Sequence, residues 1–107
     1  MTDEKTRNQA HVDGIRDGLI EAYNGDDFSE YILDMLEGCY NIEYRISADR
    51  ETVTSVEIMV ACGGPNIYID TKDREVQLRW WGSRADACIP NEICEAINEI
   101  MHECFFC

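Results

Sequence analysis

Positive charge is scarce in this chain, and long apolar runs are absent. Lys and Arg number 9 against 22 Asp and Glu, so the formal net charge is −13 at pH 7. Such a surface repels phosphate backbones, and we expect no direct binding to nucleic acid. No apolar run approaches the roughly 20 residues that a membrane span needs. Residues 1–9 are polar and lack the apolar region of a secretory signal, so we expect a cytoplasmic protein outside the membrane.

Motifs for catalysis are missing as well. His11 and His102 are the only histidines, and neither stands in a nucleophile motif. Gly63-Gly64 has neither the lysine of a phosphate-binding loop nor the glycine pattern that opens a nucleotide-binding helix. A hairpin turn explains these two glycines better. We therefore do not expect an enzyme.

The chain has the length and apolar content of one folded domain. Its 107 residues are 45% hydrophobic, which argues against disorder in spite of the charge. We expect a single α+β domain over residues 1–107, with residues 1–8 as the segment most prone to disorder.

Apolar residues recur with the period of a helix in three segments and alternate as in a strand in four others. The helical segments are residues 4–24, 27–37 and 90–104. The expected strands are residues 40–46, 54–62, 67–69 and 76–80, and residues 83–89 are expected to form a loop. Short connections favour an antiparallel meander. The predicted order is ααββββα, a four-stranded antiparallel meander with three helices packed mainly on one face.

Acidic residues recur at helical spacing in all three helical segments, where they form acidic ladders. The first ladder is Asp13, Asp17 and Glu21. The second ladder is Asp27, Glu30, Asp34 and Glu37. The third ladder is Glu92, Glu95, Glu99 and Glu103. Like charges three or four residues apart on a helix cost about 0.2–0.5 kcal/mol per pair, so the ladders lower stability.

Charge is uneven along the chain. Residues 1–37 have ten acids and three bases, giving −7, and residues 83–107 have five acids and one base, giving −4. Residues 38–82, which hold the predicted strands, have seven acids and five bases, giving −2. The ladders either keep a small protein soluble or attract a basic partner, and spacing alone does not separate these two interpretations.

One face of the predicted sheet is left uncovered by the helices. Alternation places aromatic, charged and sulfur-containing side chains on it, namely Arg45, Glu57, Met59, Tyr68, Arg79 and Trp81. Aromatic residues and Arg are enriched at interface hot spots, so Tyr68, Arg79 and Trp81 are candidates for partner binding. The alternatives are an ordinary amphipathic exterior, or a terminal segment that folds back over this face.

Six cysteines in a cytosolic chain favour free thiols or a metal over disulfides. The C-terminal quarter concentrates the candidate zinc ligands Cys88, Cys94, His102, Cys104 and Cys107. Cys104 and Cys107 have the short spacing of a ligand pair, but no second such pair exists. Cys94 and Cys104 also fit the apolar stripe of the last helix. A structural zinc is thus an alternative to ordinary thiols, and no other cofactor is expected.

The most distinctive stretch of the chain is VACGGPNIYIDT at residues 60–71, followed by RWWG at residues 79–82. It resembles short acidic proteins from phages and mobile elements of Gram-positive bacteria, a group that includes anti-CRISPR proteins. The resemblance covers residues 40–104, supports a hairpin and core strands, and brings no catalytic residue. It implies a protein that binds the basic surface on which a Cas effector holds guide or target nucleic acid.

Three hypotheses follow. The first is an acidic anti-CRISPR inhibitor whose second and third ladders act as an approximate nucleic-acid mimic on a Cas nuclease or its guide-RNA complex, with type II Cas9 foremost. The second is a zinc-stabilised protein-interaction module that uses the open sheet face and the C-terminal helix. The third is a small protein whose acids only solubilise it and which forms a homodimer through Phe105 and Phe106.

Overall fold

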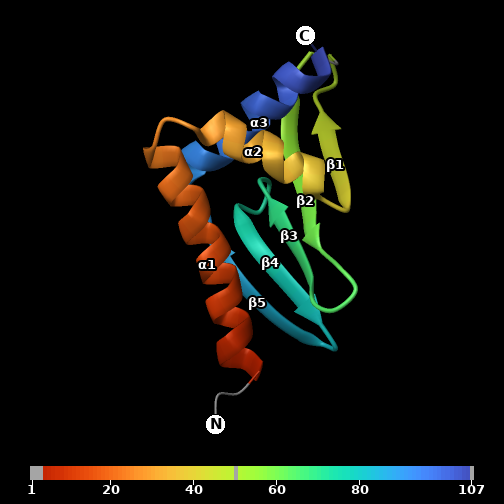
Figure 1. Ribbon diagram of the computed structural model, residues 1–107. Coiled ribbons are helices and arrows are strands. Elements are labelled where there is room, and N and C mark those ends of the chain that lie inside the picture. Colours follow the sequence, from red (N-terminus) through yellow and green to blue (C-terminus); the bar gives the residue numbers. More distant parts are fainter. Residues whose placement is uncertain (1–3, 50, 107) are drawn as a thin grey trace.

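The computed structural model describes residues 4–49 and 51–106, and the side chains up to residue 104. The elements in chain order are α1 (Glu4–Asn24), α2 (Phe28–Gly38), β1 (Asn41–Ile46), β2 (Val53–Ala61), β3 (Asn66–Asp70), β4 (Glu75–Trp80), β5 (Ser83–Cys88) and α3 (Asn91–Phe106). The fold is α+β, with three helices and a five-stranded antiparallel open sheet in the order ααβββββα (Figure 1).

The sheet is a meander in which each strand pairs with the next, from β1 at one edge to β5 at the other. The four expected strands are confirmed, but the expected loop at residues 83–89 is wrong because Ser83–Cys88 form β5. A two-residue turn, Trp81-Gly82, joins β4 to β5, and both residues have positive φ (52° and 78°). This backbone matches the strand twist of a tight hairpin. It fixes the register of a strand that has few residues of high β propensity.

The core lies between the helices and one face of the sheet. Each of the three helices contributes fully buried side chains, such as Val12, Ile32 and Ile97. They meet apolar residues that alternate along β2 to β5, among them Ile58 and Leu78. In β5 the residues at the inward-facing positions are Ala85 and Ala87, which are buried where α1 packs against β4 and β5. Small side chains let the helix lie close to this edge of the sheet.

The start of α1 is part of this packing. Residues 1–8 were expected to be the segment most prone to disorder; residues 4–8 lie in the first turns of α1, and residues 1–3 are outside the described residues. Asn8 is only 8% exposed. Nearby, the side-chain amide Nε2 of Gln9 donates a hydrogen bond to the backbone O of Asp86, 2.9 Å away, and ties α1 to β5.

A buried polar group fixes α3 over the sheet. The Thr71 hydroxyl donates a hydrogen bond to Oδ1 of Asn98 at 2.7 Å and accepts one from the N–H of Val56 at 2.8 Å. Nδ2 of Asn98 in turn donates to the backbone O of Thr54 at 3.2 Å. Buried polar groups are stable only when they are satisfied in this way, so these contacts set the position of α3 and of the ladder it carries.

The two edges of the sheet differ. Helix α1 packs along β5, whereas β1 pairs with β2 on one side and with no described strand on the other (Figure 1). Tyr44 and Ile46 of β1 point to the helix side of the sheet, opposite the buried Val56 and Val53, yet they are 39% and 41% exposed.

Candidate partner-binding surfaces

The second and third ladders are fully on the surface. All eight of their carboxylates are exposed, namely Asp27, Glu30, Asp34, Glu37, Glu92, Glu95, Glu99 and Glu103. Helices α2 and α3 contain no Lys or Arg, and they contact one another over the same face of the sheet. Within residues 4–49 and 51–104, none of these carboxylates forms an ion pair. The two helices therefore present concentrated, uncompensated negative charge.

The first ladder is different because it is partly neutralised. Arg16 lies 3.8 Å from Asp13 and 3.0 Å from Asp17, measured between guanidinium nitrogen and carboxylate oxygen. Opposite charges at this distance reduce the field that a distant partner experiences. The ladder of α1 therefore presents less uncompensated charge than those of α2 and α3.

Several ladder residues stand where they oppose the helix dipole. The last turns of α2 and α3 have no basic residue, and Glu37 and Glu103 lie close to their C-terminal ends. Negative charge there costs about 0.3–1 kcal/mol because the carboxyl end of a helix is itself negative. At the other end of α2, Asp27 occupies the N-cap position but makes no side-chain capping hydrogen bond. Glu37 and Glu103 therefore lower the stability of their helices, whereas Asp27 lies at the positive end of α2, where negative charge is favourable.

The open face of the sheet holds a second set of carboxylates that the sequence did not reveal. Glu43, Glu57, Asp70 and Glu75 lie directly opposite one another on four neighbouring strands. We call these four residues the carboxylate row. Burial, then the neighbouring carboxylates of Asp70 and Glu43, raises the pKa of Glu57, and Arg45 acts in the opposite direction. Alternation in the expected strands places only Glu43 and Glu57 on this face, and the strand register shows that all four acids are adjacent.

A shallow hollow of about 400 Å³ lies beside the carboxylate row. The charged side chains that line it are Glu43, Arg45, Glu57, Asp70 and Lys72. Because both signs of charge are present, the hollow is far closer to neutral than the ladders.

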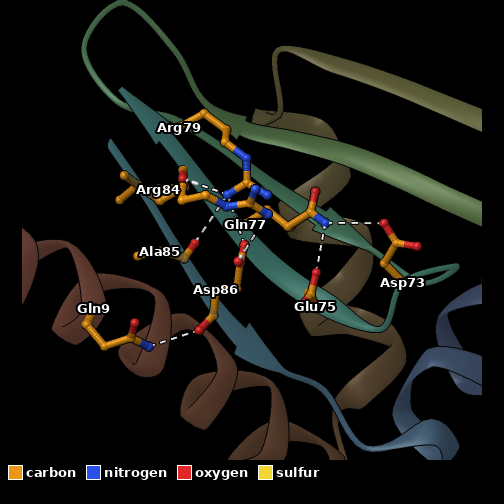
Figure 2. A network of polar contacts seen from close by, with 9 residues as sticks. Gln9, Asp73, Glu75, Gln77, Arg79, Arg84, Ala85 and Asp86 are labelled. Carbon is orange, nitrogen blue, oxygen red and sulfur yellow. Dashed lines mark hydrogen bonds and ion pairs between the residues drawn. The ribbon is translucent and has the colours of Figure 1, made fainter. Parts of the chain in front are cut away.

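Arg79, predicted to bind a partner, is already engaged within the protein. One guanidinium nitrogen lies 2.9 Å from Oδ1 of Asp86 and donates to the backbone O of Leu78 at 2.8 Å (Figure 2). Arg84 is 3.5 Å from the other carboxylate oxygen of Asp86 and remains largely exposed. Asp86 thus holds two arginines, and Arg84 is the one available to a partner.

Tyr68 and Trp81 do not share one surface. Tyr68 is half-buried on the open face between Met59 and Gln77. Trp81, expected on the same face, instead stands in the β4–β5 turn, where it is 86% exposed. Its φ of 52° is rare for a bulky residue, since the left-handed conformation costs roughly 1–2 kcal/mol.

The candidate zinc ligands are dispersed in the part of the chain that the structure describes. Cys88 and Cys104 are exposed, His102 is half-buried and Cys94 is buried in the core. Burial raises the pKa of the Cys94 thiol to about 11, which disfavours the thiolate that zinc binds. No group of three or more His, Cys, Asp or Glu residues able to hold a metal ion occurs among the described residues. Cys107 lies outside them, so a zinc site stays a prediction.

Comparisons with known proteins return nothing. No protein-family model, curated protein or solved structure matches this chain. The arguments on function therefore come from the residues themselves. Among the described residues, no helix is long and apolar enough to cross a membrane.

Proposed function

We propose that this protein is an acidic protein-binding inhibitor that acts in the bacterial cytoplasm and occupies a basic surface of its partner. The observation that carries the proposal is the exposure of eight carboxylates on α2 and α3, with no Lys or Arg on either helix and no ion pair within the described residues. Mixed charges would also keep such a surface soluble, and they would avoid the repulsion between like charges along each helix.

The resemblance of residues 40–104 to short acidic phage and mobile-element proteins, a group that includes anti-CRISPR proteins, suggests the kind of partner. Cas effectors hold the guide–target heteroduplex in a basic channel, so the partner in this proposal is a Cas nuclease or its guide-RNA complex, type II Cas9 first. Carboxylates three or four residues apart on a helix follow one another at about 4.5–6 Å, since the rise is about 1.5 Å per residue. Duplex DNA has one charge per roughly 1.7 Å of axis, so the mimicry is approximate and shape must contribute.

The inhibitor would act by competition. The acidic helices are attracted to the basic channel over long range, and this raises the rate of association. Once seated, they occupy arginines and lysines that would otherwise hold phosphates. The protein needs no catalytic group for this mechanism, and none is proposed.

The second ladder provides the test. Reversal of its charge in Glu30→Lys, Asp34→Lys and Glu37→Lys should weaken inhibition of DNA cleavage by a purified Cas9–guide RNA complex at least about tenfold, because three exposed attractions become repulsions. The matched control reverses Asp13, Asp17 and Glu21 on α1 and should cost much less. Circular dichroism checks that both variants fold. Equal inhibition by wild type and the α2 variant would contradict the electrostatic mechanism.

The open sheet face and the exposed Trp81 favour a second candidate, a protein-interaction module. An exposed indole in a strained turn is a typical hot-spot anchor. The zinc that the sequence suggested would be structural in such a module. Elemental analysis of protein purified without chelator tests it: a zinc-to-protein ratio near zero, with no loss of melting temperature in EDTA, removes the metal from this candidate.

A further inference from the structure

Strand β1 has an unusual composition for an exposed edge. Its central residues, Ile42-Glu43-Tyr44-Arg45-Ile46, alternate between apolar and charged. The apolar residues point to the helix side of the sheet, where Ile42 and Tyr44 lie opposite Ile58 and Val56. Glu43 and Arg45 lie on the open face. Natural edge strands are usually shortened, bulged or covered to prevent pairing. The β1–β2 pairing has one irregularity, between Arg45 and Ile46, and its extra residue is Thr54 of β2, so β1 itself stays regular.

The backbone of β1 is suited to accept another strand. The backbone O of Arg45 accepts a hydrogen bond from Oγ1 of Thr54, and the N–H of Ser47 donates to the O of Thr52. Odd-numbered residues of β1 therefore direct their backbone groups toward β2. Alternation then directs the backbone groups of Ile42 and Ile46 toward the outer edge, as a template for a further strand.

We propose that β1 is the dimerisation edge of this protein, and that its occupant is β1 of a second copy. The two strands run antiparallel about a two-fold axis that passes beside Tyr44, and they join two five-stranded sheets into one. This pairing is isologous, as expected for a closed dimer of identical chains.

The charged residues of β1 favour the register in which Tyr44 lies opposite Tyr44 of the second copy. With Tyr44 opposite Tyr44 of the second copy, Glu43 faces Arg45 of the second copy, and Arg45 faces its Glu43. The backbone also allows two neighbouring registers. One of them places Glu43 opposite Glu43 of the second copy, and the other places Arg45 opposite Arg45 of the second copy. Like charges directly opposite each other on neighbouring strands are unfavourable, and opposite charges are favourable.

The apolar residues agree with the same register. Ile42 then faces Ile46 of the second copy, twice, and the two tyrosines meet between these pairs. Tyr44 and Ile46, now 39% and 41% exposed, would lose exposure on the helix side of the joined sheets. One arrangement thus satisfies the charges of one face and the apolar side chains of the other.

The net charge of −13 on each copy opposes association. The pairing surface is also small, so the dimer should be weak and visible only at high concentration. Salt screens the repulsion between copies over about 8 Å at 0.15 M ionic strength. Raising salt from low values should therefore strengthen the dimer, whereas it weakens the binding of a basic partner. The dimer does not depend on the inhibitory function.

Sedimentation equilibrium of the full chain tests the proposal from about 1 µM to about 1 mM at 0.15 M salt. The wild-type mass should rise from 12.3 kDa toward twice that value. Glu43→Arg and Arg45→Glu should each remain monomeric. An equimolar mixture of the two variants should associate again, because every facing pair in the mixed dimer is then of opposite charge. The double variant should also dimerise.

Two outcomes overturn the proposal. One is a wild-type mass that stays at the monomer value over the whole range. The other is a dimer that both single variants keep, since that dimer uses a different surface. The double variant Phe105→Ser, Phe106→Ser identifies one such surface, because a dimer through the tail phenylalanines would be lost in it while a dimer through β1 would not.

Discussion

The acidic ladders of α2 and α3 and the carboxylate row of the open sheet face are both negative, but they hold their charges differently. The ladder carboxylates are exposed and follow one another along helices with no cation near them. The carboxylate row stands across four strands, beside Arg45 and Lys72. The ladders can thus act on a distant basic surface, whereas Arg45 and Lys72 offset part of the charge of the row. Both sets lower stability, and this shared cost makes the comparison testable.

The hairpin tip should give the largest change in stability. Replacing Trp81 by Asn should stabilise the protein by about 1 kcal/mol, because Asn tolerates positive φ and Asn-Gly is favoured in such turns. Thermal unfolding measures this gain. Gly82→Ala is the matched control and should destabilise the protein, since Gly82 has a φ of 78°. A loss of stability in Trp81→Asn would mean that the indole makes stabilising contacts within the fold and is not available to bind a partner.

The ends of the ladders should give a change of similar size. Glu37→Lys and Glu103→Lys place positive charge at the carboxyl ends of α2 and α3 and should together raise the unfolding free energy by about 1 kcal/mol at low salt. The gain should shrink at about 1 M salt, where screening is strong. The same pair of changes should weaken inhibition of the Cas9–guide RNA complex. Unchanged or improved inhibition would show that the ladders are dispensable for binding.

The carboxylate row should give the smallest change, with a defined pH dependence. Because the pKa of Glu57 in the folded protein is raised above 4.5, ionisation of Glu57 costs stability as pH rises through that raised pKa. Glu57→Gln removes this cost and should stabilise the protein by about 0.5 kcal/mol at pH 7. Below pH 4.5 the two proteins should be equally stable. Denaturant titrations at pH 4 and pH 7 measure the difference, and a gain of the same size at both pH values would contradict this origin.

Features that depend on local spacing could be predicted from the sequence, and features that depend on register could not. The ladder of α2 follows from the helical recurrence of Glu30, Asp34 and Glu37, and the structure places all three on the surface. Strand β5 was missed because Ala85 and Ala87 have low strand propensity and are held there by α1.

The adjacency of charges across strands is the main property that the sequence concealed. Glu57 meets Glu43 and Asp70 only through pairings with two different strands, so no spacing along the chain indicates it. The same holds for Arg79, whose partner Asp86 lies on the next strand. Trp81 was expected on a strand by alternation, but the tight turn to β5 removes it from the sheet face.

The salt dependence of partner binding tests the central claim most directly. The dissociation constant of the protein and a purified Cas9–guide RNA complex would be measured by calorimetry or interferometry, with the α2 reversal variant in parallel. Between about 0.05 and 0.2 M salt, we expect binding of the wild type to weaken at least about tenfold, since long-range attraction between exposed charges is screened. The α2 reversal variant should bind more weakly and show a shallower dependence. Wild-type binding that is tight but independent of salt, or equal to that of the variant, would contradict the account.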